Sequence, residues 1–178
     1  MNAQPGTGFR LAVPADAPRL VDLIQSAYRG EASRDGWTSE ADLVAGDRID
    51  LPQVRHIITT PGSMMLVLDE DGRLTGCCAV QDRGGGVAYF GTFAVSPLAQ
   101  GRGTGRRLMA EAERRAVADF GAATMEITVL AQQDALLAWY ERLGFRRTGE
   151  ERPFPADATF ARPLRDGLHF VVLTKNLV

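Results

Sequence analysis

Hydrophobic and polar positions recur along the chain with two periods, which divide it into helical and extended segments. Near the N-terminus, apolar residues follow the spacing of a helix at Leu20, Leu23, Ile24, Ala27 and Tyr28. Asp16 is a candidate cap for this helix, Pro18 is tolerated in its first turn, and Gly30 supplies a stop signal. We therefore expect one amphipathic helix between Asp16 and Gly30.

Between residues 63 and 95 the pattern changes to the shorter period of strands. The expected strands are Met64–Leu68, Leu74–Gln81 and Val87–Val95. Turns at Glu70–Gly72 and Gly84–Gly86 separate them. Strands joined by such short turns pair in sequence order, so we predict an antiparallel meander.

The rest of the chain continues this mixture of elements. The further expected strands are Phe9–Val13, Met125–Leu130, Phe145–Thr148 and Leu168–Thr174. The further expected helices are a short one within Trp37–Asp50, and then Pro52–Thr60, Thr104–Phe120 and Asp134–Leu143. In a chain of 178 residues, this order is consistent with a single α+β domain over residues 1–178, built on a mixed, mostly antiparallel sheet flanked by helices.

Composition and charge are those of an ordinary globular protein. The chain is 45% hydrophobic and 24% charged, and no apolar run approaches the ~20 residues that cross a bilayer. Met1–Gly8 lacks the basic and apolar parts of a signal peptide, so we expect a cytoplasmic protein with no membrane partner. A net charge of −2 without a basic stripe argues against a nucleic-acid partner.

The charge is distributed unevenly. Residues 1–72 hold 11 acids and 6 bases, whereas residues 73–178 hold 11 acids and 14 bases. A basic half suits phosphates and an acidic half suits an amine, although ordinary surface variation is the alternative. The adjacent Cys77 and Cys78 would point to opposite faces of a strand, as small buried thiols. His56 and His169 lack ligand spacing with them, so we expect no metal.

The segment Gln100–Arg107 carries the strongest functional signal. Gly101, Gly103 and Gly105 alternate with other residues between an expected strand and an expected helix. The start of a helix has unpaired N–H groups and a partial positive charge, and glycines let a ligand approach them. Arg102, Arg106 and Arg107 add basic side chains. This arrangement predicts a socket for a phosphate or pyrophosphate.

Two common phosphate-binding motifs do not fit this loop. The nucleotide-triphosphate loop ends in Gly-Lys-Ser/Thr, but Gly105 is followed by Arg106. The dinucleotide fingerprint requires a third glycine where Arg106 stands. It also belongs near the start of a strand-helix-strand unit, whereas this loop lies past the middle of the chain.

The loop instead resembles the acetyl-coenzyme A loop of the GNAT superfamily of N-acetyltransferases. Two further segments match that family in the same order: Tyr89–Pro97 resembles its central strand, and Ala135–Phe145 resembles its later helix with the Gly-Phe that follows. The likeness extends over about the whole chain and is weakest around residues 30–60. Gly36–Ala41 and Arg152–Pro155 resemble a bacterial subgroup of the family.

The resemblance implies a site and a mechanism. A bulge would part the central strand from the next one, so that the arm of acetyl-coenzyme A (acetyl-CoA) pairs with the exposed backbone. The N–H of Val95 would polarise the acetyl carbonyl, and Tyr140 would donate a proton to the departing thiolate. The implied cofactor-binding residues are Phe93, Ala94, Val95, Gln100, Gly101, Arg102, Gly103, Thr104, Gly105, Arg106 and Gln133.

The sequence departs from the family pattern at the general base. Many members carry a glutamate on the central strand or the next one, but the matching positions here are Gly91, Thr92 and Thr128. Glu126, a water chain or bulk solvent would then take the amine proton. Trp139 has two interpretations, core packing or coenzyme contact. The candidates that would shape the acceptor site are Tyr28, Glu31, Asp35, Trp37 and Glu40.

Three functions are compatible with these residues. The first is transfer of an acetyl group from acetyl-CoA to a primary amine of a small molecule, by direct attack in a ternary complex. The second is acetylation of a protein N-terminus or lysine, which requires an open groove. The third is an acyl-CoA-binding regulatory module without turnover. A homodimer is also compatible with the resemblance.

Overall fold

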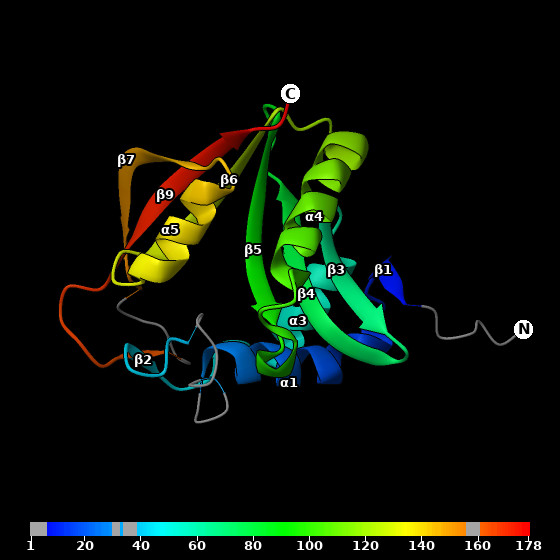
Figure 1. Ribbon diagram of the computed structural model, residues 1–178, viewed down its shortest axis with the longest axis horizontal. Coiled ribbons are helices and arrows are strands. Elements are labelled where there is room, and N and C mark those ends of the chain that lie inside the picture. Colours follow the sequence, from blue (N-terminus) through cyan, green and yellow to red (C-terminus); the bar gives the residue numbers. More distant parts are fainter. Residues whose placement is uncertain (1–6, 30–32, 34–38, 156–160) are drawn as a thin grey trace, which may run out of the picture.

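The computed structural model describes residues 7–29, 33, 39–155 and 161–178. The expected helix stop at Gly30 and the acceptor-site candidates Glu31, Asp35 and Trp37 lie outside these residues. Within the described ranges, the chain folds as a mixed α+β structure around one large sheet (Figure 1).

The described residues form a seven-stranded sheet with the strand order β1-β3-β4-β5-β6-β9-β7. Its strands, in chain order, are β1 Gly8–Leu11, β3 Ser63–Glu70, β4 Arg73–Asp82, β5 Val87–Val95, β6 Thr124–Leu130, β7 Arg146–Pro153 and β9 His169–Asn176. The predicted meander is confirmed, because β3 pairs with β4 and β4 pairs with β5, both antiparallel. The β5–β6 pair is parallel, and the sheet is otherwise antiparallel.

Four helices pack on the two faces of this sheet in the part of the chain that the structure describes. They are α1 Ala17–Tyr28, α3 Leu51–Thr59, α4 Thr104–Phe120 and α5 Asp134–Arg142. One core lies between the sheet and α1 with α3, and a second lies between the sheet and α4 with α5. The neighbouring Cys77 and Cys78 belong to different cores, because successive strand residues point to opposite faces.

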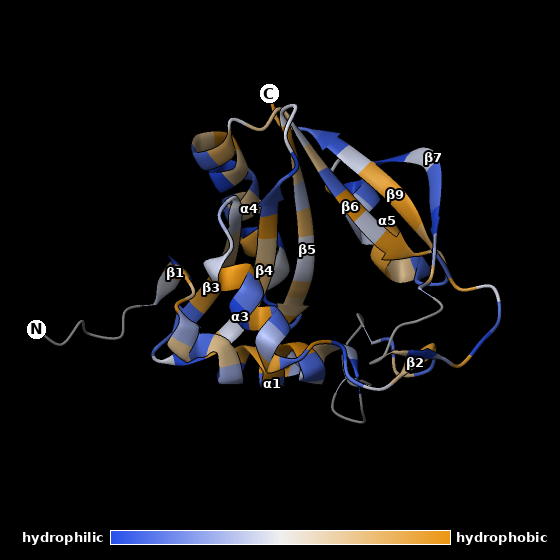
Figure 2. Cartoon of the chain, turned by 180° about the vertical axis from the view of Figure 1, so that it is seen from behind, coloured by the Kyte–Doolittle hydropathy of each residue, from blue (hydrophilic) through white to orange (hydrophobic). Residues whose placement is uncertain are grey.

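The end of the sheet beyond β9 is strongly polar. β7 carries Arg146, Arg147, Glu150 and Glu151, and its hydrophilic colour contrasts with the apolar stretch of β9 (Figure 2). Charged side chains on an edge strand oppose pairing with another strand. The strand is longer than predicted, since we expected it to stop at Thr148.

The helix predicted within Trp37–Asp50 is wrong for residues 39–50. These residues form turns and the two-residue strand β2, Val44–Ala45, which pairs with β8, Arg162–Pro163. Leu43 and Val44 pack against Leu130 and Leu168, so contacts far along the chain decide the local conformation. The following helix α3 is as predicted, and Asp50 caps it with a hydrogen bond from the Gln53 N–H at 2.8 Å.

Asp16 does not cap α1 as predicted. Its carboxylate accepts the Val13 N–H at 2.9 Å, which closes a 3-10 turn over Pro14–Asp16 ahead of the helix. The same buried carboxylate receives the Arg10 guanidinium at 2.7 Å and the Arg19 guanidinium at 2.7 Å. The hydrogen bond from Arg10 is the main cause that holds the pKa of Asp16 at about 2.

This ion cluster makes stability depend on acid pH. The folded-state pKa of Asp16 lies below its ordinary value of 3.8, so its stabilisation is complete above that value and is lost as the pH falls towards about 2. Screening around the partly exposed arginines limits the effect to about 1–2 kcal/mol. We expect urea unfolding to show this loss between pH 5 and pH 2, and a shallower loss in Asp16→Asn. If the free energy of unfolding fell equally steeply with pH in the wild type and in Asp16→Asn, the pH dependence would not come from Asp16.

Candidate active site

The central strand β5 carries a bulge between Gly91 and Ala94, as the resemblance implied for this strand. Cys77 of β4 pairs with Ala94, but Ala79 pairs with Gly91, so β5 contains one extra residue in this stretch. Thr92 lies in the left-handed region with φ 48°, which is unusual for a threonine. An extra residue of this kind bends a strand and re-aims its backbone groups.

Beyond the bulge, one edge of β5 is free of strand pairing. β5 and β6 pair only over Val87–Tyr89 and Thr124–Glu126, and in Figure 1 the two strands diverge from there. The Ser96 N–H donates to Thr75 on the β4 side. Because backbone groups of successive strand residues point to opposite edges, those of Val95 face the side away from β4.

Two side chains bind carbonyl groups on this open edge. The Tyr28 hydroxyl, at the end of α1, donates to the Phe93 carbonyl oxygen. The Gln100 amide donates to the Val95 carbonyl oxygen at 3.1 Å. The first contact joins α1 to the bulge, and the second joins the glycine-rich loop to the end of β5. The Tyr28 contact was not predictable from the spacing of residues in the sequence.

A hydroxyl pair bridges the strands where they part. The hydroxyl oxygens of Tyr89 on β5 and Thr128 on β6 are 2.7 Å apart. A side chain at Gly91 would meet the Tyr89 ring at 2.8 Å, so the glycine is needed for this ring position. The Thr128 hydroxyl is therefore hydrogen-bonded to Tyr89. As a threonine, this residue has no carboxylate that could accept a proton.

The glycine-rich loop forms a pocket of about 440 Å³ at the start of α4, which we call the loop pocket. Gly101 and Gly103 have φ values of 80° and 75°, and a Cβ at either would meet nothing within 4 Å. Their backbone is therefore open to an approaching ligand. The other residues that line the pocket are Val95, Gln100, Thr104, Gly105, Arg106, Ala135, Trp139 and Arg142.

The loop pocket has basic character. Arg106 from the first turn of α4 and Arg142 from the last turn of α5 line it, and no acidic side chain does so among the described residues. The pattern of the loop indicated Arg106 but gave no sign of Arg142. Arg102 is exposed outside the lining, and the Arg107 guanidinium lies 5.6 Å from the Phe9 ring centroid on another side.

Gly105 lets α4, α5 and β5 approach closely. A Cβ there would lie 3.1 Å from Phe93 and 3.5 Å from Trp139. These two rings stack with centroids 5.6 Å apart and planes 12° apart. Trp139 therefore packs on the core and also lines the loop pocket, so both interpretations of this residue apply.

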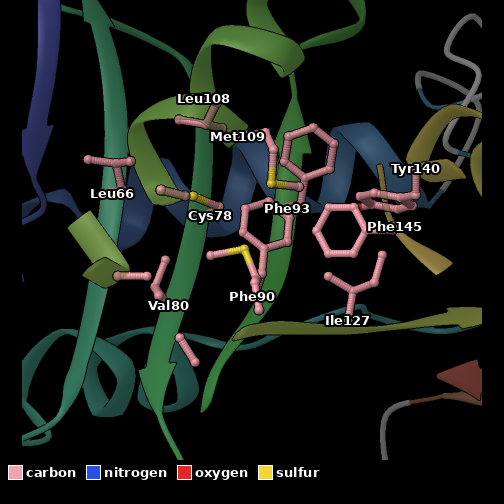
Figure 3. Close-up of a cluster of buried hydrophobic side chains, with 14 of the residues drawn as sticks. Leu66, Cys78, Val80, Phe90, Phe93, Leu108, Met109, Ile127, Tyr140 and Phe145 are labelled. Carbon is pink, nitrogen blue, oxygen red and sulfur yellow. The ribbon is translucent and has the colours of Figure 1, made fainter. Parts of the chain in front are cut away.

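A second cavity, of about 270 Å³, lies between the parted strands, and we call it the inner cavity. Phe93 from the bulge, Gln133 from the start of α5 and Tyr140 from the middle of α5 all line it. The ring plane of Tyr140 lies at 59° to that of Phe93 and at 75° to that of Phe145, and Figure 3 shows the three side chains in one buried cluster. The structure thus brings Tyr140 and Gln133 to the same cavity as the bulge.

The environment of Tyr140 suits a proton donor. The residue is 4% exposed, and burial raises the pKa of its phenol well above the ordinary value. Among the described residues its hydroxyl has no hydrogen-bond partner, while the side chain lines the inner cavity. A phenol in this setting remains protonated at neutral pH and can donate to a neighbouring atom.

A third cavity, of about 400 Å³, adjoins the inner one, and we call it the outer cavity. The side chains that line both cavities are Glu40, Arg48, Leu130 and Phe170. Those that line only the outer cavity are Arg29, Asp47, Gln53, Phe154, Pro155 and Ala161. Tyr28 and Glu40, two of the acceptor-site candidates, are thus found in the lining of the inner cavity.

The acids of the site have different surroundings. Glu40 is buried and pairs with the Arg29 guanidinium at 3.1 Å. Glu126 is in an ion pair with Arg152 at 3.0 Å and is absent from the lining of the inner cavity. Glu40, one of the acceptor-site candidates, is therefore better placed than Glu126 for contact with an acceptor.

None of the helices in the part of the chain that the structure describes is both long and apolar enough to span a membrane. Across the same residues, no group of three or more His, Cys, Asp or Glu side chains is arranged to hold a metal ion.

Comparison with known proteins connects this geometry to a family. The family model described as the acetyltransferase (GNAT) domain matches residues 38–155. Mycothiol acetyltransferase of Tsukamurella paurometabola is 33% identical over 139 residues, which are 75% of this chain and 46% of that protein. The chain spans about half the length of the curated relatives that it matches.

Solved structures share the fold. The ribosomal-protein-S18-alanine N-acetyltransferase of Escherichia coli aligns with a TM-score of 0.69 and 17% identity, over 97% of this chain and 94% of the other. A Salmonella typhimurium structure that contains its cofactor acetyl-CoA aligns with a TM-score of 0.67 and 21% identity, over 97% and 95%. Because the family model matches about two thirds of its residues, the chain belongs to the GNAT family of acetyltransferases, for which acetyl-CoA is the acetyl donor.

Proposed function

We propose that this protein transfers an acetyl group from acetyl-CoA to a primary amine of a small molecule. The observation that carries the proposal is the parting of β5 from β6 at the bulge, with the loop pocket on one side and the inner cavity on the other. The loop pocket suits a diphosphate, and the inner cavity holds the candidate acid. When bound, the coenzyme supplies an activated thioester.

The residues of the loop pocket fit the charged part of acetyl-CoA. The first N–H groups of α4 have no partners within the helix, and Gly101 and Gly103 leave the backbone around them accessible. Arg106 and Arg142 add positive charge. We assign Gln100, Gly101, Thr104 and Arg102 to the same binding segment, where Arg102 lies at the exposed rim.

The open edge of β5 would hold the arm of the coenzyme. The backbone groups of this edge come from Phe93, Ala94 and Val95. Gln133, at the start of α5, also lines the inner cavity. Because the Val95 backbone faces away from β4, its N–H is our candidate for polarising the acetyl carbonyl. A fixed donor of this kind can lower an activation barrier by about 3 kcal/mol.

Tyr140 is the proposed general acid. The amine nitrogen forms a bond to the acetyl carbon, the carbon–sulfur bond breaks, and the Tyr140 phenol gives its proton to the sulfur. The proton lost by the amine leaves through water in the two adjoining cavities, which Glu40 lines. The phenol is reprotonated from solvent, so the protein is unchanged after one turnover.

The dimensions of the acceptor side favour a small molecule. The outer cavity of about 400 Å³ has the size of ordinary small-molecule sites, and Phe154, Pro155 and Ala161 close one side of it. The curated relatives, named mycothiol acetyltransferases, support this class of acceptor. Acetylation of a protein N-terminus is the second candidate, because one structural neighbour is named for that activity on a ribosomal protein.

We further propose that residues 1–178 form one acetyltransferase domain. The family match covers residues 38–155, but β1 and β9 lie outside it and belong to the same sheet. α1 likewise lies outside and supplies Tyr28 to the bulge.

Thiol release tests the function. Purified protein with acetyl-CoA is mixed with amino acids, polyamines, aminoglycosides or peptides with free N-termini, and free coenzyme thiol is followed by a colorimetric reagent. We expect release that depends on a small amine. Release only with peptides would favour protein acetylation, whereas tight acetyl-CoA binding with no amine-dependent release would favour a silent binding module.

A further inference from the structure

Arg48 lies at the junction of the inner and outer cavities and has no ion pair with any of the described residues. It lines both cavities and is partly buried. Its guanidinium carbon lies 5.3 Å from the centroid of the Tyr28 ring, and no carboxylate of the described residues is within ion-pair distance. The hydroxyl of the same Tyr28 donates to the Phe93 carbonyl oxygen at the bulge, so the Tyr28 ring lies between Arg48 and the bulge of β5.

The position of Arg48 is fixed by its neighbours. Its backbone N–H donates to the Gln25 side chain at 2.8 Å, which ties the residue to α1. The ring contact with Tyr28 then orients the side chain. A guanidinium held in this way is prepared for an anionic ligand, because less side-chain entropy is lost on binding.

The other charges of the two cavities do not neutralise Arg48. Glu40 is engaged by the Arg29 guanidinium, which also donates to the Gly46 carbonyl at 3.0 Å. Asp47 lines the outer cavity only and is exposed. Arg29 itself has one unsatisfied group, because its Nε is buried and has no hydrogen-bond partner. Burial lowers the pKa of Arg29, and the nearby charge of Arg48 lowers it further; an anion between the two guanidinium groups would relieve this repulsion.

Part of the lining of the outer cavity is apolar. Phe154 and Phe170 stack with ring centroids 5.9 Å apart, and Leu130 lies beside them in a small buried cluster. An acceptor in this space would therefore meet both a guanidinium and aromatic rings.

We propose that the acceptor is a primary amine that also carries a carboxylate and an apolar side group, in the manner of an apolar amino acid, and that Arg48 binds the carboxylate. This inference rests on the proposed function. The carboxylate lies at the junction of the cavities, the amine extends into the inner cavity towards Tyr140, and the apolar group lies against Phe154 and Phe170.

The test compares acceptors that differ in one charge. Phenylalanine, leucine and methionine are assayed beside their carboxamides in the wild type, Arg48→Gln and Arg48→Lys. A hydrogen-bonded charge pair corresponds to about tenfold or more in kcat/KM, so Arg48→Gln should lower the acid-to-amide ratio by that factor. Arg48→Lys should restore part of it. Comparing ratios between variants cancels the different basicities of the amines.

A matched control and a binding measurement complete the test. Arg55→Gln removes an exposed arginine on α3 that lines neither cavity, and it should leave the ratio unchanged. Saturation-transfer NMR on the wild type with coenzyme A should show N-acetylphenylalanine binding more tightly than its carboxamide, independently of turnover.

The outcomes separate this inference from the proposed function. Amine-dependent thiol release with equal use of acids and amides, or an unchanged ratio in Arg48→Gln, overturns the inference and leaves acetyl transfer intact. Without thiol release from any amine, the NMR comparison decides: tighter binding of the acid supports carboxylate recognition in a silent module, and equal or weaker binding overturns it.

Discussion

Replacing Tyr140 by phenylalanine is expected to lower kcat by about 100- to 1,000-fold while the Kd for acetyl-CoA stays nearly unchanged. The substitution removes only the hydroxyl of Tyr140, which lines the inner cavity, and keeps the ring contacts with Phe93, Trp139 and Phe145. The departing thiolate would then take its proton from water. Steady-state kinetics at saturating acetyl-CoA, together with calorimetric titration of the coenzyme, measure the two quantities.

Tyr89→Phe is the matched control for this prediction. It removes another hydroxyl from the same cavity, but that hydroxyl is paired with Thr128 rather than free. Its effect on kcat should be far smaller. Burial keeps the Tyr140 pKa well above its ordinary value, so the phenol should not limit the rate at moderately alkaline pH. Undiminished turnover in Tyr140→Phe would remove this residue from the mechanism.

Substitution of Gly103 by alanine is expected to weaken acetyl-CoA binding by about 10- to 100-fold. Gly103 stands at the N-terminus of α4 with φ 75°, a conformation that costs alanine about 1–2 kcal/mol. The loop would relax, and the N–H groups that we assign to the diphosphate would lose their alignment. Charge-assisted hydrogen bonds contribute about 1.5–3 kcal/mol each, which sets the expected range.

Gly121→Ala provides the comparison at the other end of the same helix. Gly121 has φ 63°, and a Cβ there also meets nothing within 4 Å. Both variants should therefore lose similar stability in urea unfolding. Only Gly103→Ala should show the increase in Kd by calorimetry, and an equal increase in both would indicate a general loss of helix stability instead of a loop contact.

Elements with a long, regular pattern were predictable from the sequence. The helix over Thr104–Phe120 has the predicted bounds, and the meander over residues 63–95 has the predicted pairing. In these elements the conformation is determined by the periodicity of neighbouring residues and by turns that contain glycine. Residues 39–50 were predicted wrongly, because their apolar positions pack against Leu130 and Leu168, which are distant in the sequence.

The same distinction applies to the candidate site. The loop pocket was predictable because Gln100–Arg106 are consecutive and glycine has a specific effect on the backbone. The Tyr28 contact with Phe93 joins residues 65 positions apart, and no spacing rule indicates it. Arg48 and Arg142 were missed for the same reason, since each reaches its cavity only through the packing of separate elements.

A crystal structure of the protein with acetyl-CoA tests the central claim most directly. We expect the diphosphate against the backbone N–H groups that follow Gly101, and the arm along the open edge of β5. The thioester oxygen should be within hydrogen-bond distance of the Val95 N–H, with the sulfur beside the Tyr140 hydroxyl. Coenzyme bound away from the loop pocket, or a thioester outside the inner cavity, would contradict the account.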